Sequence, residues 1–226
     1  MLRLHDHRTG QVQEIPPYAL SVHVHTGSER ALVTADLLRR VAERARRRAI
    51  LTRSEQVRPH VEFGELSLPE VEVADPETLP DDAVWVGSEA VLGHRCLTVP
   101  PERYEWAKLV ESASVDPLCV RLAILRERYS EPDMMDGDLV VVAGRDLAHW
   151  REAVAEWATQ PGRPMDRAYA AEAEAALWDD LDSPTALSVL DQLIADPGVE
   201  PGAKLETAIH LDLVLGLDLV ADIGRA

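Results

Sequence analysis

The stretch from Tyr18 to Thr52, YALSVHVHTGSERALVTADLLRRVAERARRRAILT, decides the fold class. Its first part is apolar and β-branched and ends at Thr26-Gly27-Ser28, which is typical of a buried strand that closes in a turn. From Ala31 to Arg48 the apolar residues recur at helical spacing, with arginines on the other side. AILT then resumes as a short strand. Strand, turn, helix and strand in this order form a βαβ unit, which predicts a parallel sheet.

Outward from this unit, the chain divides into two halves. Residues 2–5 and 11–15 alternate apolar and polar around Thr9-Gly10, which predicts a hairpin. Between residues 59 and 101, short apolar pieces lie among Pro, Asp and Gly and predict further strands and loops. After Pro101 the spacing becomes helical, and the predicted helices cover residues 104–112, 117–129, 138–159, 165–181, 184–195 and 202–219. We expect a reduced Rossmann-like α/β domain over residues 1–112 and an all-α helical bundle over residues 113–226.

The charge of the chain narrows the classes of partner. The 226 residues carry 23 basic and 40 acidic side chains, for a formal net charge of −17. Residues 1–60 hold 11 arginines against six acidic residues, whereas residues 61–226 hold 12 basic against 34 acidic residues. An acidic majority repels nucleic-acid phosphates, so contact with tRNA is expected only through the arginine-rich segment Arg39–Arg48. The alternative for this segment is a solvated helix face that pairs with the acidic remainder.

Membrane insertion and disulfide bonding are not expected. No apolar run approaches the ~20 residues of a membrane span. The N-terminal segment carries charge where a signal peptide would have its apolar region. Two cysteines, Cys96 and Cys119, form no disulfide framework and fit a reducing compartment. We therefore expect a cytoplasmic protein.

Three stretches carry a resemblance to a known family. Residues 116–132 read DPLCVRLAILRERYSEP, residues 176–193 read ALWDDLDSPTALSVLDQL, and the chain opens with LRLHDHRTGQVQEIPP. They resemble, in the same order, segments of cysteinyl-tRNA synthetases and of the related mycothiol-pathway cysteine ligases. The resemblance covers most of the chain. It implies a class I aminoacyl-tRNA-synthetase-like fold.

The two signatures with which this family activates an amino acid are missing. Its H-I-G-H signature, whose histidines contact ATP phosphate, has no counterpart between Thr26 and Leu37. The family's mobile K-M-S-K-S loop also has no counterpart before Asp116. The segment where this loop is expected contains a single lysine, Lys108. Activation needs positive charge on the pyrophosphate. The resemblance therefore implies a truncated paralogue that does not activate cysteine.

The resemblance also implies a candidate zinc site. His25 aligns with the family's first zinc cysteine and His94 with its zinc histidine, while Cys96 lies nearby. Zinc accepts imidazole and thiolate ligands. The family's second cysteine has no clear counterpart, and Thr98 stands where its glutamate would be. The alternative is a set of polar residues left at strand ends.

A second candidate site lies where two predicted strands end. Ligands of open α/β sheets bind at the carboxyl ends of strands, and helix N-termini favour anions. An ordinary strand-to-helix turn that needs glycine is the alternative. We expect an ATP-like or AMP-like nucleotide, or a small acid, to bind there. The candidate residues are Thr26, Gly27, Ser28, Gly87, Ser88 and Glu89, of which Gly87 and Ser88 match a family motif on the adenosine side.

Three functions remain open. The first is a degenerate cysteine-ligase-like protein that binds a small molecule or a protein partner. The second is a ligase or transferase that uses a preformed activated substrate, with His25, His94 and Glu89 as its polar groups. The third is an interaction module with an acidic helical face. The acidic run Asp179–Asp182 precedes Ser183-Pro184 at a helix boundary, which predicts helix caps and not a catalytic cluster.

Overall fold

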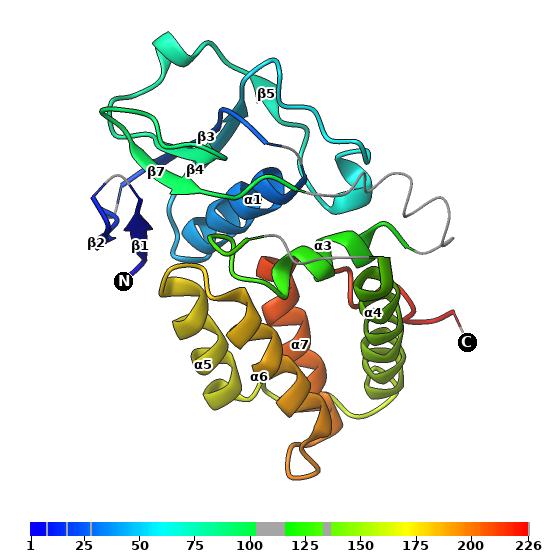
Figure 1. Cartoon of the computed structure of the whole chain (residues 1–226). Helices are drawn as coiled ribbons and strands as arrows, with labels where there is room; N and C mark the ends of the chain where they lie inside the picture. The colour runs from blue at the N-terminus through cyan, green and yellow to red at the C-terminus, as the bar shows by residue number, and fades with distance from the viewer. Residues whose placement is uncertain (8, 17, 28, 103–115, 133–136, 226) are drawn as a thin grey trace.

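A parallel sheet forms the α/β part of the molecule (Figure 1). The structure, a computed structural model, describes residues 1–7, 9–16, 18–27, 29–102, 116–132 and 137–225. Within these ranges the sheet has five strands in the order β5-β4-β3-β6-β7, and every neighbouring pair is parallel. The predicted α/β class with a parallel sheet is confirmed. The strands are β3 (Leu20–Val24), β4 (Ala49–Arg53), β5 (Glu72–Val73), β6 (Val84–Gly87) and β7 (Arg95–Thr98).

Helix α1 (Glu29–Arg44) connects β3 to β4 and packs on one face of the sheet. The β3 residues Leu20, Val22 and Val24 are buried in the same apolar core as α1, as the alternation of a strand requires. The helix ends earlier than the predicted Arg48, because Arg46 adopts a left-handed backbone with φ 59°. The predicted βαβ unit is thus confirmed, with a shorter helix.

The opposite face of the sheet holds a small second cluster. Ala83, Trp85 and Cys96 are buried there, and Val91 packs against them. Val91 belongs to the connection of residues 88–94, which joins the parallel strands β6 and β7. Parallel strands usually need a crossover of about a dozen residues or more. This shorter connection returns the chain to the sheet edge.

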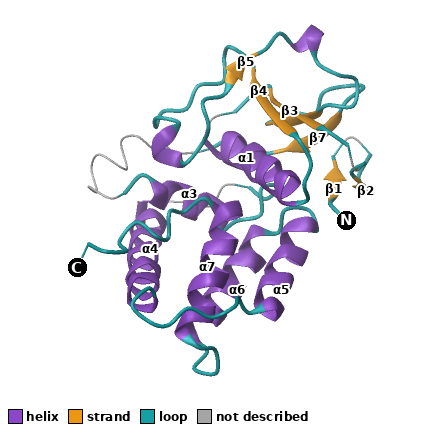
Figure 2. Cartoon of the chain, turned by 180° about the vertical axis from the view of Figure 1, so that it is seen from behind, coloured by secondary structure: helices purple, strands orange, loops and turns teal. Residues whose placement is uncertain are grey.

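Helices make up the second half of the described chain (Figure 2). The predicted helices that lie in this part are confirmed, with boundaries that differ by a few residues; the one predicted over residues 104–112 lies outside the described residues, as does the expected domain boundary at 112. No helix of the described ranges is long and apolar enough to cross a membrane. The helices are α3 (Leu118–Leu125), α4 (Gly137–Trp157), α5 (Arg167–Trp178), α6 (Ser183–Ala195) and α7 (Pro201–Leu215).

A buried ion pair joins α1 to the helical half. The guanidinium of Arg121 on α3 donates to Asp36 on α1 at 2.9 Å, and neither side chain is exposed to solvent. Arg121 also donates to the carbonyls of Leu215 (2.6 Å) and Leu66 (3.1 Å). A buried charge costs free energy unless it is paired and hydrogen-bonded. This one guanidinium therefore holds four segments together: α1, α3, the end of α7 and the short 3-10 helix Gly64–Leu66.

The predicted hairpin is also present, as β1 (Arg3–Asp6) and β2 (Gln11–Glu14). It lies beside β7, where the amide of His7 donates to the carbonyl of Cys96 at 3.1 Å. On its other side, the carboxylate of Asp180 accepts from the amide of His5 (2.7 Å) and from the hydroxyl of Tyr129 (2.6 Å). The hairpin thus connects the sheet to the helical half.

Candidate functional site

The strand order places a topological switch point between β3 and β6. The chain runs from β3 to β4 and β5 on one side of the sheet, then returns to β6 and β7 on the other. In open parallel sheets, ligands bind outside the carboxyl ends of the strands at this point. Five of the six predicted residues follow these two strands: Thr26 and Gly27 after β3, and Gly87, Ser88 and Glu89 at the end of β6. The sixth, Ser28, lies outside the described residues.

The two strand ends are in direct contact. The hydroxyl of Thr26 accepts from the amide of Ser88 at 2.9 Å and lies 3.2 Å from its hydroxyl. The ring of His25 donates through Nε2 to the carbonyl of Glu89 at 3.0 Å. The structure therefore brings these candidates together, and in doing so joins them to one another.

Gly87 explains why the strand ends can approach so closely. A methyl group at this position would lie 2.4 Å from Oγ1 of Thr26 and 2.6 Å from Cε1 of His25. Only glycine fits there, because real Cβ atoms do not come within 3.0 Å of such neighbours. Side chains of the protein itself thus occupy the space between the ends of β3 and β6.

The N-terminus of α1, next to this contact, also has an internal partner. The amide of Arg30 donates to the carboxylate of Glu102. Free amides at a helix N-terminus and the helix dipole attract anions. Here a carboxylate of the same chain supplies the negative charge. Nothing in the local sequence pattern indicates this contact, because the two residues are 72 positions apart.

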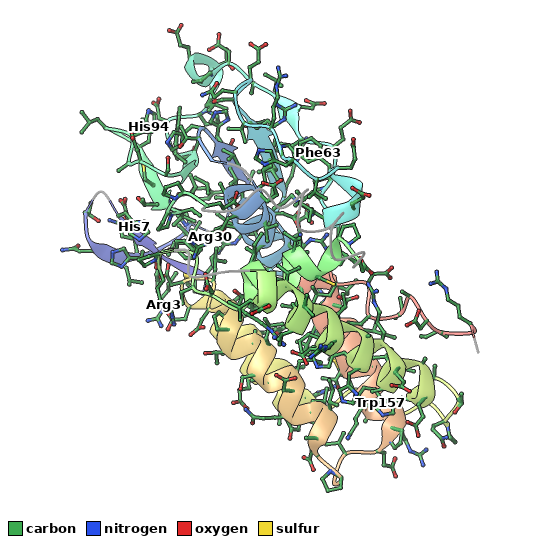
Figure 3. All side chains as sticks on the ribbon, turned by 45° about the vertical axis from the view of Figure 1, so that its right-hand side comes forward. Arg3, His7, Arg30, Phe63, His94 and Trp157 are labelled. Carbon is green, nitrogen blue, oxygen red and sulfur yellow. The ribbon has the colours of Figure 1, made fainter. Side chains whose placement is uncertain are left out.

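The side chain of Arg30 does not supply the positive charge for a pyrophosphate that the missing family signatures would provide. It is buried, and its NH2 group donates to the carbonyl of Arg128 at 3.0 Å, after the end of α3. Among the described residues, its Nε and NH1 groups have no hydrogen-bond partner. In Figure 3 it lies in the interior, toward the helical half. The guanidinium is therefore used in the contact between the two halves.

The predicted zinc residues gather around Trp85. The ring centroid of Trp85 lies 4.6 Å from that of His94 and 5.7 Å from that of His25, while Cys96 packs in the same small cluster. The Sγ atom of Cys96 accepts from the amide of Val91 at 3.0 Å. Burial lowers the pKa of His25 and, next to it, lowers the pKa of His23 to about 4, so both rings are neutral at pH 7.

The predicted zinc residues are not assembled as a metal site in the described part of the chain, and the zinc site stays a prediction. Within the described ranges, no group of three or more His, Cys, Asp or Glu side chains is arranged to hold a metal. His25 already uses Nε2 on a backbone carbonyl, and Cys96 is turned to the Val91 amide. The Nδ1 atoms of both histidines and Nε1 of Trp85 are buried, and none of them has a hydrogen-bond partner in the ranges that the structure describes.

The acidic run of the helical half has structural roles. Asp182 caps α6 by accepting from the amide of Thr185 at 3.2 Å, which confirms the predicted cap. Asp179 pairs with Arg3 at 2.9 Å. The contact of Asp180 with the hairpin was not expected, because residues 175 positions apart share no local pattern.

The arginine-rich segment also contacts the chain itself. Arg39 and Arg40 pair with the buried Asp36, and Arg44 pairs with Glu174 at 3.3 Å. Arg47 donates to the carbonyl of Pro16 at 2.9 Å. Contact with tRNA through this segment stays a prediction.

Fold and site together define an open parallel α/β protein with a Rossmann-like strand order and a helical region. Comparison with known proteins narrows this class, although no protein-family model matches the chain. The chain is 35% identical over 108 residues to an L-cysteine:1D-myo-inositol 2-amino-2-deoxy-alpha-D-glucopyranoside ligase of Streptosporangium roseum. It is 35% identical over 109 residues to the ligase of the same name from Salinispora arenicola, and 33% over 137 residues to that from Beutenbergia cavernae.

These matches cover part of each protein. They include 46% of this chain for the first two relatives and 59% for the third. The chain spans only 26% to 31% of the length of these curated relatives. The comparisons confirm the resemblance to cysteine ligases that the motifs indicate.

Proposed function

We propose that this protein is a relative of the cysteine ligases that does not activate cysteine with ATP and that acts by binding a small molecule or a protein partner. The observation that carries the proposal is the filled ligand end of the sheet. There the carboxylate of Glu102 accepts from the first turn of α1, and Thr26 is hydrogen-bonded to Ser88.

Electrostatics favours this proposal. ATP carries several negative charges. Group transfer from ATP needs cations or hydrogen-bond donors that point at its phosphates. The residues at the switch point offer hydroxyl groups and glycines, and Glu89 adds a carboxylate. A phosphate at the N-terminus of α1 would have to displace Glu102 or lie beside a like charge, which is unfavourable.

The test is ATP–pyrophosphate exchange with cysteine as the amino acid. We expect no cysteine-dependent exchange above background, while the Streptosporangium roseum ligase, assayed beside it, serves as the positive control. Cysteine-dependent exchange by the purified protein would contradict the proposal. A thermal-shift assay with ATP and AMP on the same preparation checks that the protein is folded during the measurement.

Regulation or partner binding has its own test. If the protein acts through a partner, a stable complex should be recovered from cells that express a tagged chain. The matched control is the Arg3→Gln variant, which removes the exposed ion pair with Asp179 and should leave the fold intact.

A further inference from the structure

A hollow lies at the carboxyl-end edge of the sheet, away from the switch point between β3 and β6. None of the contacts described above uses it. It has a volume of about 360 Å³ and lies at the carboxyl ends of β4 and β5, whose last residues Arg53 and Val73 line it. Pockets that hold small ligands start at about 300 Å³. Figure 3 shows Phe63, also in the lining, on the opposite side of the α/β part from His94. The hollow is therefore distinct from the Trp85 cluster.

We infer that this hollow binds a small organic ligand with a single anionic group, a carboxylate or a phosphate monoester, attached to an apolar body. The inference does not depend on the proposed loss of cysteine activation, because none of the switch-point residues lines the hollow.

Arg53 supplies the anion-binding group. Its guanidinium is fixed by two backbone carbonyls, since Nε donates to Val71 at 3.1 Å and NH1 to Val57 at 2.9 Å. The NH2 group makes no hydrogen bond in the part of the chain that the structure describes. A planar guanidinium with donors to spare is the preferred partner of carboxylates and phosphates. Because it is already held in place, little side-chain entropy is lost when a ligand binds.

Phe63 supplies the surface for the apolar body. The guanidinium carbon of Arg53 lies 5.6 Å from the centroid of the Phe63 ring. The buried side chain of Val61 and the exposed one of Val73 extend this apolar surface. An anion bound to Arg53 can thus place an attached aromatic or branched group against the Phe63 ring.

The wall of the hollow is preformed. Glu29, a fully buried carboxylate on α1, accepts from the amide of His60, from the amide of Val61 at 3.1 Å and from the ring of His60 at 3.2 Å. A buried carboxylate is stable only with such donors. The chain after the lining residues is held at Leu66, whose carbonyl accepts from the Arg121 guanidinium. The lining therefore does not need to fold around a ligand.

The charges of the rim set the class of anion. Arg58 adds a second guanidinium, but Glu55 and Glu62 bring two carboxylates into the same lining. A ligand with several negative charges, such as a nucleoside triphosphate, would be repelled by these carboxylates. A ligand with a single anionic group can approach Arg53 and Arg58 while keeping its apolar part on Phe63. The charge balance thus favours a ligand with a single anionic group.

The test uses benzoate and phenyl phosphate as probes, with benzamide as the neutral match of benzoate. Titrations of the isotope-labelled protein follow the NMR signals of the Phe63 ring and of the Arg53 Nε–H group. We expect both anions to shift these signals saturably, and benzamide to bind at least about tenfold more weakly, since a charge-assisted hydrogen bond is lost. The anion that binds more tightly shows whether the natural group is a carboxylate or a phosphate.

Variants make the test specific. Arg53→Gln should abolish the shift of the Phe63 ring signals, but it also removes two backbone contacts. Arg58→Gln changes an exposed side chain and should weaken binding about threefold or more while the fold is kept. Arg163→Gln, an exposed arginine of the helical half, is the matched control and should leave binding unchanged. The inference is overturned if neither anion binds saturably, if benzamide binds as tightly as benzoate, or if Arg58→Gln binds like the wild type.

Discussion

Single residues at the strand ends determine what this sheet can bind. Gly87 allows the two strands to touch, Thr26 and Ser88 join them, and Glu102 reaches the N-terminus of α1 from a distant part of the chain. None of these contacts needs a ligand. The same positions in a Rossmann-like sheet are where a ligand would be expected.

Removing the Glu102 carboxylate should expose the anion preference of α1. We expect Glu102→Ala to lower the free energy of unfolding by about 1–2 kcal/mol in phosphate-free buffer, because the Arg30 amide loses its acceptor. Added inorganic phosphate should restore part of this loss. Glu102→Gln, which keeps an acceptor, is the control. Equal stability of the wild type and Glu102→Ala at every phosphate concentration would show that the contact has no such role.

Gly87 should not accept a side chain. Gly87→Ala places a methyl group 2.4 Å from Thr26 and 2.6 Å from His25, and we expect a loss of about 1–3 kcal/mol in unfolding free energy. Gly64→Ala is the matched control, because its new methyl group would have no neighbour within 4 Å. Urea denaturation measures both variants. Equal midpoints for the two would be inconsistent with the close packing of the strand ends.

His23 should make the protein less stable in acid. Burial, together with the nearby His25, lowers its pKa from the ordinary 6.5 to about 4. The unfolded chain therefore takes up a proton before the folded one does. Stability is complete above pH 6.5 and falls as the pH drops toward about 4.

The variant His23→Gln tests this pH dependence. Glutamine can still bond to Thr52 and Ser54, the two partners of the ring, but it does not titrate. We expect its unfolding free energy to fall less between pH 7 and pH 4 than that of the wild type, by up to about 3 kcal/mol. His149→Gln, on the exposed side of α4, is the control. Parallel pH profiles for wild type and His23→Gln would rule out this titration.

At the scale of elements, α1 is the central one. It packs on the sheet with one side and meets α3 and α7 with another, as Figures 1 and 2 both show. Asp36 stands at this junction. Burial by itself would raise the pKa of this carboxyl, but Arg121, Arg40 and Arg39 outweigh it and hold the pKa below its usual range. The charged pair is therefore present at all but strongly acidic pH.

Breaking this pair from one side should be costly. Arg121→Met removes three hydrogen bonds of a fully buried guanidinium, and we expect a loss of about 3–5 kcal/mol in unfolding free energy. The double variant Asp36→Leu, Arg121→Met should lose less than the sum of the two single losses. Denaturant unfolding of the four proteins closes this cycle. Strictly additive losses would argue against a direct coupling.

At the scale of the whole molecule, these contacts predict one cooperative unit. The hairpin, α1 and Arg121 each connect the sheet to the helices, so the α/β part and the helical part should unfold together. Hydrogen exchange should give the same opening free energy for amides of β3 and α6. Clearly different values would instead support two independent domains with a boundary near residue 112.

The elements with strong local patterns could be predicted from the sequence, and the contacts between them could not. The βαβ unit and the helices follow from apolar spacing that each segment carries by itself. The pairing order of the short strands β5 to β7 and the contact of Arg30 with Glu102 depend on partners far along the chain. For the same reason the sequence indicates that the candidate residues follow neighbouring strands, but it does not predict their contacts with one another or the packing of Trp85 against both candidate zinc histidines.

The central claim is that the ligand end of the sheet is filled by the protein itself. The most direct measurement is an NMR titration with magnesium ATP that follows the backbone amides of Arg30, Gly87 and Ser88. These three amides report on the N-terminus of α1 and on the end of β6. We predict that none of them moves saturably, because Glu102 and Thr26 already bind the Arg30 and Ser88 amides. Saturable shifts of all three at ATP concentrations that leave the rest of the spectrum unchanged would contradict the account.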